Sequence, residues 1–351
     1  MPQDLGFTVP FPSRSNPAAP ASRAHNLAWA RRHGLLRSPR AERRYLYSQV
    51  AEFAAHAYPD AGADDLDLAF DLMGWFFLFD DQFDIPDPRH LREATAACQE
   101  HLLVVAHPDT PVRATRPTAR AFADCWHRMC QGTSPLWQAR TAHAWMDYFT
   151  AQLTEIADRN DEGHLDYDTH LARRRRTIGI TPSLCLSERI DRLRVPDIAW
   201  HSTHLNGLRR AAIDQVIGVN EIFSLEKEEE HAAPNLVHDL MRLHGHTRQE
   251  AVHHVRDMAD ERMRQFVELH DRTPHWCVAQ GLAPDETRAV TRYTELVAVW
   301  VRGNYDWHRT ARRYTTTSTG RGPRHLGALT TEDLSAPRER RRPSTTLRPR
   351  T

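Results

Sequence analysis

The stretch Asp80-Asp81-Gln82-Phe83-Asp84 places three carboxylates directly after a strongly apolar segment. On a helix, Asp80 and Asp84 lie one turn apart and share a face, whereas Asp81 points about 100° away. Carboxylates beside an apolar core lose hydration and repel one another, and a bound cation offsets that cost. A solvated helix end would explain such acids on their own. The aromatic residues that immediately precede them favour a metal-binding rim on an apolar wall.

A second group of oxygen ligands lies at Asn220, Ser224 and Glu228, which follow one another at i, i+4 and i+8. They continue an apolar helical stripe made of Leu205, Leu208, Ala212, Ile213, Val216 and Ile217. An amide, a hydroxyl and a carboxylate on one helix face are hard ligands of the kind that Mg²⁺ accepts, with water and phosphate oxygens completing its shell. A helix that emerges into solvent would explain the acidic run that follows, but not Asn220 or Ser224.

Basic and aromatic residues accompany these two groups. Arg173 to Arg176 precede Thr177-Ile178-Gly179-Ile180-Thr181-Pro182, where β-branched residues, Gly and Pro predict a helix break. Arginine clusters usually lie on solvated surfaces, but a guanidinium beside a helix break is also well placed to bind a diphosphate. Near the C-terminus, an apolar stripe at helical spacing runs through Val290, Tyr293, Leu296, Val297, Trp300, Asn304, Trp307, Ala311 and Tyr314. On its own, this stripe is more typical of core packing than of a cofactor site.

All of these groups fall on segments with helical periodicity. We expect helices over 64–83, 135–157, 165–176, 197–229 and 285–314, of which the first is almost wholly apolar and therefore central. No segment alternates apolar and polar residues between turn signals, so the sequence does not support a β-sheet. The sequence predicts an all-α fold.

The 351 residues carry 46 basic and 46 acidic side chains, a balance that argues against a dedicated nucleic-acid or membrane-surface binder. We expect an extended, proline-rich arm over residues 1–25, a helical domain over 26–316, and a disordered tail over 317–351. The tail holds eight arginines against three acids, so the body before it is acidic and suited to collecting divalent cations. Among all the basic residues only Lys227 is a lysine.

The five cysteines show neither zinc-site spacing nor a small disulfide framework, so we expect reduced, packed thiols. The N-terminus lacks a basic segment followed by an apolar run, and no apolar stretch approaches the roughly 20 residues that cross a bilayer. We therefore expect a soluble, cytoplasmic protein.

Taken in order, these motifs resemble those of bacterial class I terpene synthases, over nearly the whole body from about Phe7 to Tyr314. The matching pieces are PFPSRSNP in the arm, FLFDDQFD, RRRRTIG, NEIFSLEKE and VRGNYDWHRTARRY. One aspartate-rich motif would be weak evidence, but this order, with Asp80 and Asn220 140 residues apart, is very specific. The resemblance implies a single-domain class I terpenoid synthase-like helical bundle around a central apolar active-site cavity.

The resemblance also implies roles for individual residues. Asp80 and Asp84, with Asn220, Ser224 and Glu228, would bind three Mg²⁺ ions, and Asp81 would assist through water or arginine contacts. Arg174, 46 positions before Asn220, would sense the diphosphate, which Lys227, Arg313 and Tyr314 would also bind. Thr177 and the carbonyl of Ile178 fall at the linker and effector positions of the helix break, although the linker is often acidic in the family. Phe76, Phe77 and Trp307 would contour the apolar pocket.

By this resemblance, the protein is a terpene cyclase that ionises a linear isoprenoid diphosphate and cyclises the allylic cation to a hydrocarbon or alcohol. Farnesyl diphosphate is the expected substrate and geranylgeranyl diphosphate the leading competitor. We expect no nucleic-acid or membrane partner, and a monomer or homodimer.

Two alternative functions share some of these features. A chain-elongating prenyl diphosphate synthase would carry a second aspartate-rich motif where this chain has Asn220, Ser224 and Glu228. A non-catalytic isoprenoid-binding or nucleic-acid-associated protein that uses the basic tail would not need metal ligands on two helices. Two histidine pairs, His201 with His204 and His253 with His254, lack a matching third ligand, so we interpret them as polar surface or satisfied core.

Overall fold

The computed structural model describes residues 5–80, 88–107, 114–159, 165–231 and 233–315, and over these residues it contains helices and no strand. This confirms the all-α class. The first seven helices are α1 (Ala19–Arg32), α2 (Pro39–Ser48), α3 (Phe53–Ala57), α4 (Ala63–Asp80), α5 (Pro88–Ala106), α6 (Pro117–Cys130) and α7 (Pro135–Arg159). The remainder are α8 (Tyr167–Thr177), α9 (Ile180–Ile190), α10 (Asp197–Trp200), α11 (Thr203–His231), α12 (Leu236–His244), α13 (Arg248–Ala279), α14 (Pro284–Thr310) and α15 (Arg312–Thr315).

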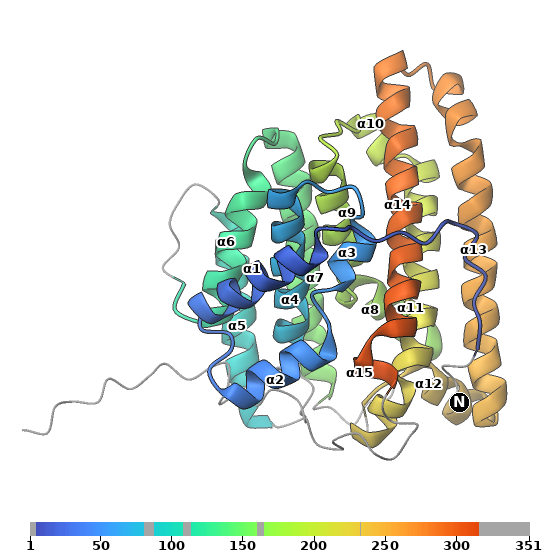
Figure 1. The fold of residues 1–351 in the computed structure, drawn as a ribbon. Coiled ribbons are helices and arrows are strands. Elements are labelled where there is room, and N and C mark those ends of the chain that lie inside the picture. The colour runs from blue at the N-terminus through green and yellow to red at the C-terminus, as the bar shows by residue number, and fades with distance from the viewer. Residues whose placement is uncertain (1–4, 81–87, 108–113, 160–164, 232, 316–351) are drawn as a thin grey trace, which may run out of the picture.

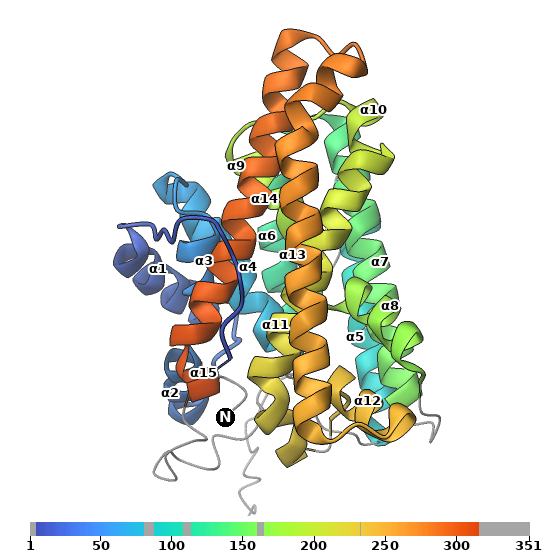
Figure 2. The same ribbon diagram turned by 90° about the vertical axis from the view of Figure 1, so that its right-hand side faces the viewer.

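Two groups of helices face each other across the molecule. Helices α4, α5, α6 and α7 pack together in one half, and α11, α13 and α14 stand side by side in the other (Figures 1 and 2). Helix α8 contacts both α7 and α11, and α9 contacts both α7 and α14, so this pair joins the two halves. Helices α12 and α15 lie at one end of the bundle and α10 at the other (Figure 1).

Helix α4 is central because its side chains are apolar nearly all round. Trp75, Phe70 and Phe79 are fully buried, and Trp75 contacts both Phe122 and Phe149 with ring centroids 4.8 and 6.0 Å away. Aromatic side chains of this size bury a large apolar area each and dominate core energetics. The expected helix over 64–83 is described as far as Asp80.

The predicted break between α8 and α9 is present, because Thr177 ends one helix and Ile180 begins the next. Gly179 adopts φ of +73°, a left-handed conformation that costs a glycine little. Pro182 lies in the first turn of α9, where its missing N–H is tolerated.

Two long helices predicted from periodicity are each divided in the structure. The segment over 197–229 forms the short α10 and then α11, and the segment over 285–314 ends as α14 before a break at Ala311. Ala311 has an extended conformation, with φ of −67° and ψ of 128°. The apolar stripe that runs to Tyr314 continues through the break at Ala311, so periodicity alone does not reveal that break.

The expected arm over residues 1–25 is too long, because α1 begins at Ala19. Pro20 lies in the first turn of this helix, where proline costs no hydrogen bond. The described part of the arm crosses α13 and α14 (Figure 1). Phe11 packs edge-on against Phe266 of α13, and Arg302 of α14 donates a hydrogen bond to the carbonyl of Val9. Residues 317–351, the expected tail, lie outside the described residues.

Four of the five cysteines, Cys98, Cys125, Cys185 and Cys277, are buried free thiols, as predicted. Among the described residues, no helix combines the length and apolar character needed to cross a membrane.

Candidate active site

The second half of α4 presents aromatic rings toward α7 and α14. Phe76 stacks on Trp145 with ring centroids 5.1 Å apart, and Phe77 packs against Trp307 with centroids 5.3 Å apart. Both phenylalanine side chains are half-buried, whereas Trp307 is buried. The three residues predicted to contour the pocket therefore lie together.

One turn later, α4 ends at Asp80. The other two acids of this motif, Asp81 and Asp84, lie outside the described residues, so their positions stay a prediction.

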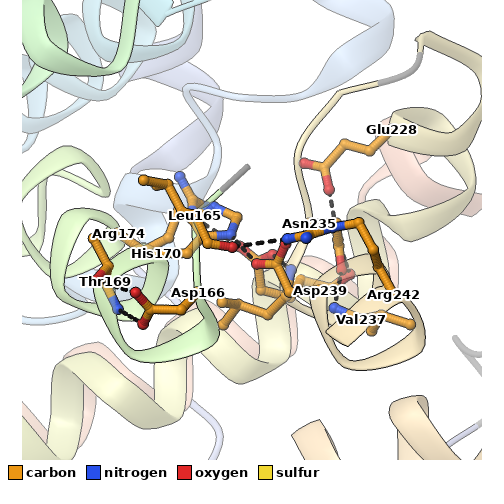
Figure 3. Close-up of polar contacts among 12 residues, drawn as sticks. Leu165, Asp166, Thr169, His170, Arg174, Glu228, Asn235, Val237, Asp239 and Arg242 are labelled. Atoms are coloured by element: carbon orange, nitrogen blue, oxygen red, sulfur yellow. Dashed lines mark hydrogen bonds and ion pairs between the residues drawn. The ribbon is translucent and has the colours of Figure 1, made fainter. Parts of the chain in front are cut away.

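Helix α11 carries Asn220, Ser224 and Glu228 on one face. The Ser224 hydroxyl donates to the backbone carbonyl of Asn220 at 2.7 Å, which leaves the lone pairs of its oxygen available as acceptors. Glu228 Oε2 accepts a hydrogen bond from Asn235 Nδ2 at 2.6 Å (Figure 3). Asn235 also caps α12, since its side chain accepts a bond from the backbone N–H of Val237. The cap of α12 thus holds the Glu228 carboxylate in place.

The four consecutive arginines of α8 reach four different places. Three of them pair with acids of α7 and α11, as Arg173 with Asp158, Arg175 with Asp214 and Arg176 with Asp147. Arg174 instead donates from Nε to Glu221 Oε1 and from Nη2 to Asn220 Oδ1, both at 2.8 Å. Its guanidinium therefore contacts the proposed metal-ligand oxygen of Asn220.

Helix α15 brings Arg313 and Tyr314 to the same end of the bundle. The Arg313 guanidinium carbon lies 5.2 Å from the centre of the Phe77 ring, a cation–π distance. The Tyr314 ring stacks on His308 of α14 with centroids 5.0 Å apart. Both residues follow the break at Ala311 and lie where α15 contacts α11.

These elements enclose two adjoining cavities. The first, which we call the apolar chamber, has a volume of about 120 Å³. Its lining includes the aromatic residues Phe53, Phe76, Phe77, Tyr148, Trp300 and Trp307 and the helix-break residues Thr177, Ile178 and Gly179. The second, which we call the polar cavity, has a volume of about 90 Å³ and is lined by Glu155, His170, Ser224, Lys227, Glu228, Arg313 and Tyr314, among others. Four residues line both: Phe77, Asp80, Arg174 and Asn220.

Charges are crowded in the polar cavity. Burial opposes the charge of Arg174, but the surrounding carboxylates, first that of Glu221, outweigh it and raise its pKa. For Glu228, burial and the neighbouring Glu221 raise the pKa to about 7, against the hydrogen bond from Asn235. A carboxylate held in this way marks a place where added positive charge is stabilising.

The donor set fits a hard divalent cation. Asp80 and Glu228 offer carboxylates, Asn220 an amide and Ser224 a hydroxyl, the oxygen ligands that Mg²⁺ accepts. No group of three His, Cys, Asp or Glu side chains in the described ranges is arranged to hold a metal by itself. An ion there would need the amide, the hydroxyl and oxygens from water or diphosphate.

Sequence reasoning missed several residues of the two cavities. Glu221, which pairs with Arg174, is adjacent to Asn220 in NEIFSLEKE, and its 47-residue separation from Arg174 gave no signal of contact. His308 donates from Nδ1 to the carbonyl of Asn304 at 2.8 Å and lies 3.3 Å through Nε2 from the amide nitrogen of Asn220. Burial lowers the His308 pKa to about 4, so the ring is neutral and Nε2 accepts the bond from Asn220.

Of the two histidine pairs, His204 is described here with its partners, and it behaves as interpreted. His204 is buried, shares a 2.9 Å hydrogen bond with Thr273 and stacks on Trp276 with ring centroids 4.8 Å apart. It is a satisfied core residue.

Known proteins similar to this chain identify its family. Residues 71–265 match the model of terpene synthase family 2, C-terminal metal binding. The chain is 40% identical to R-linalool synthase from Streptomyces clavuligerus, over 95% of this chain and 98% of that protein. It is 38% identical to (-)-beta-caryophyllene synthase, described as (2E,6E)-farnesyl diphosphate cyclizing, from Saccharothrix espanaensis, over 89% of each chain.

Among solved structures, the chain resembles linalool/nerolidol synthase from Streptomyces clavuligerus in complex with 2-fluorogeranyl diphosphate. The TM-score is 0.80 at 39% identity, covering 88% of this chain and 100% of that one. The protein therefore belongs to the terpene synthase family, and it is a bacterial class I terpene synthase of all-α fold. Membership implies a divalent metal and an isoprenoid diphosphate substrate.

Proposed function

We propose that the protein is a Mg²⁺-dependent sesquiterpene cyclase that ionises farnesyl diphosphate, with three ions bound together with the diphosphate. The main support for this proposal is the pair of adjoining cavities, one lined by charged groups and one by aromatic rings. The two cavities share Phe77, Asp80, Arg174 and Asn220. A diphosphate in the polar cavity would place an attached prenyl chain in the apolar chamber.

Bound magnesium would supply positive charge that turns the diphosphate into a good leaving group. Asp80, Asn220, Ser224 and Glu228 would hold it, with Asp84 as a further predicted ligand and Asp81 in support. Around the diphosphate, Arg174, Lys227 and Arg313 would add preorganised positive charge and Tyr314 a hydroxyl donor. These groups stabilise the electron pair that leaves with the diphosphate oxygen as the carbon–oxygen bond breaks.

The apolar chamber then has to stabilise an allylic cation without attacking it. The faces of Phe76, Phe77 and Trp307 provide negative charge density, worth about 0.5–2 kcal/mol for each close contact. The break formed by Thr177, Ile178 and Gly179 lies against Phe76, so a movement there would change the chamber when diphosphate binds.

Two candidate substrates differ in the length of the prenyl chain. The caryophyllene synthase relative is named for farnesyl diphosphate, which favours the fifteen-carbon substrate. The structure with 2-fluorogeranyl diphosphate favours a ten-carbon one as the second candidate.

Incubation of the purified protein with Mg²⁺ and geranyl, farnesyl or geranylgeranyl diphosphate tests the proposal. Gas chromatography with mass spectrometry identifies the products, and a colorimetric assay measures released diphosphate. We expect farnesyl diphosphate to be consumed with the highest kcat/KM. A folded protein that consumes none of the three would refute the assignment, and preference for the ten-carbon substrate would replace farnesyl with geranyl diphosphate.

A further inference from the structure

Two polar side chains of the apolar chamber each have an oxygen without a hydrogen-bond partner among the described residues. Asn304 of α14 is 6% exposed and lines the chamber, yet its side-chain oxygen Oδ1 is buried and accepts no hydrogen bond from any described residue. Its backbone carbonyl is already occupied by His308. Thr177, which is 5% exposed and lines the same chamber, likewise has a buried hydroxyl oxygen without a partner among the residues described.

Other polar groups that line this chamber are paired. The Ser183 hydroxyl donates to the carbonyl of Gly179 at 2.8 Å. The indole N–H groups of Trp300 and Trp307 donate to Tyr58 Oη and to the carbonyl of Gln49, at 3.3 and 2.8 Å. Among the described residues that line the chamber, the unpaired oxygens of Asn304 and Thr177 are therefore exceptions.

An unpaired buried polar group costs about 1–3 kcal/mol. A hydrocarbon chain cannot recover this cost because it has no hydrogen-bonding group, whereas a water molecule can. A chamber of about 120 Å³ has room for a water, which needs roughly 10–15 Å³ and at least two polar partners. Asn304 and Thr177 supply two such partners, from α14 and from the end of α8.

We propose that Asn304 and Thr177 hold one water molecule in the apolar chamber and that this water attacks the carbocation, so that the product is an alcohol. The inference rests on the proposed function and decides between its two product classes. Because Asn304 Oδ1 accepts one hydrogen of the water, a lone pair of the water oxygen is left to face the cation.

The step balances without a further reactant. The water oxygen donates an electron pair to the cationic carbon and forms the new C–O bond. The resulting protonated alcohol loses one proton to the released diphosphate, which left with the electron pair of the original bond. Substrate and water thus become alcohol and protonated diphosphate.

The first experiment uses the unmodified protein in ¹⁸O-labelled water with Mg²⁺ and, separately, geranyl and farnesyl diphosphate. We expect a terpene alcohol as the main product, carrying the heavy oxygen. A product that is mainly hydrocarbon, or an alcohol that retains unlabelled oxygen from the diphosphate, would overturn the inference and leave the synthase assignment standing. Absence of both product and diphosphate release would contradict the proposed function itself.

The second experiment replaces the polar group at similar volume. In Asn304→Leu we expect the ratio of alcohol to hydrocarbon, normalised to the diphosphate released, to fall at least tenfold. Asn304→Val is the substitute if the leucine does not fold, and Thr177→Val should lower the ratio less. Thr294→Val is the matched control on α14, since it removes a buried hydroxyl that donates to the carbonyl of Thr291 outside the chamber, and its ratio should match wild type. An unchanged ratio in both Asn304 variants would refute the role of this residue.

Discussion

The apolar chamber and the polar cavity share four residues but hold their polar groups in opposite ways. In the polar cavity, Arg174 contacts Glu221 and Asn220, and the carboxyl group of Glu228 lies near that of Glu221. In the chamber, the indole N–H groups of Trp300 and Trp307 are bonded away from the interior surface. One region concentrates charge and the other hides almost every polar group. A site that must release a diphosphate and then shelter a cation needs both.

Removing a ligand from the polar cavity should have the largest effect. Asn220→Ala deletes the amide oxygen that contacts Arg174, and we expect kcat/KM to fall at least a thousandfold, about 4 kcal/mol in activation free energy. Stability should change by less than about 1 kcal/mol, because the amide is only half-buried. Steady-state kinetics and thermal unfolding measure the two quantities.

The matched control is Asn206→Ala, an exposed asparagine near the start of the same helix. It should keep full activity. Wild-type rates in Asn220→Ala would show that this cavity is not the metal site.

A neutral imidazole is buried among the aromatic residues, so the stability of the folded protein should depend on pH. His101 is fully buried, hydrogen-bonded through Nδ1 to the carbonyl of Ala97, and in contact with Phe79 and Phe149 behind the chamber. Burial lowers the pKa of His101 from 6.5 to about 4. The unfolded chain therefore binds a proton first as pH falls, and stability decreases between pH 6.5 and 4 by up to about 3 kcal/mol.

Urea unfolding at several pH values tests this difference. His101→Gln should show a shallower pH dependence over that range, whereas the exposed His107→Gln should follow wild type. Parallel curves for wild type and His101→Gln would count against a buried neutral ring.

Gly179 tests the boundary of the chamber. It has φ of +73°, and a Cβ there would lie 2.7 Å from Cε1 of Phe76. Gly34 has the same φ with no atom within 4 Å of its Cβ position. We expect Gly34→Ala to cost about 1 kcal/mol through backbone strain, and Gly179→Ala about 2 kcal/mol or more because Phe76 must also move.

Denaturant unfolding and product analysis should separate the two glycine variants. Only Gly179→Ala should change the distribution of products. Equal stability losses with unchanged products would mean that Phe76 does not shape the chamber.

The smallest effect is expected at Lys227, the single lysine of the chain. Lys227→Arg keeps the charge but replaces a compact ammonium with a broad planar group in the polar cavity. We expect KM to rise about tenfold, equivalent to about 1.4 kcal/mol. Arg210→Lys, an exposed exchange of the reverse kind on the same helix, should leave KM unchanged. An unaltered KM in Lys227→Arg would exclude a need for a compact charge there.

The all-α class and the helix face that carries the metal ligands could be predicted because both follow from the spacing of residues that are close in sequence. Asn220, Ser224 and Glu228 follow an apolar stripe at helical intervals, and that spacing needs no knowledge of the rest of the fold. The preference for Arg174 came from the family resemblance, whereas its contact with Glu221 depends on how α8 packs against α11. No local pattern distinguishes Arg174 from three identical neighbours.

Asn304 likewise shows that local spacing predicts burial but not tertiary contacts. Its place on an apolar stripe predicted that it would be buried, as it is. Whether its oxygen would find a partner depends on side chains from α4, α8 and α9 that meet it only in the folded chain. The break at Ala311 could not be predicted because the apolar residues on both sides keep the same periodicity.

The hydrogen bond between Arg174 and Asn220 Oδ1 has a thermodynamic consequence. The guanidinium holds the oxygen that a cation would need, so a metal ion binding alone must first displace it. A diphosphate offers Arg174 another anionic partner and frees that oxygen. Metal and anion should therefore strengthen each other's binding by one common factor, whichever is added first. Calorimetric titration of Mg²⁺ with and without inorganic diphosphate, and in the reverse order, would measure it.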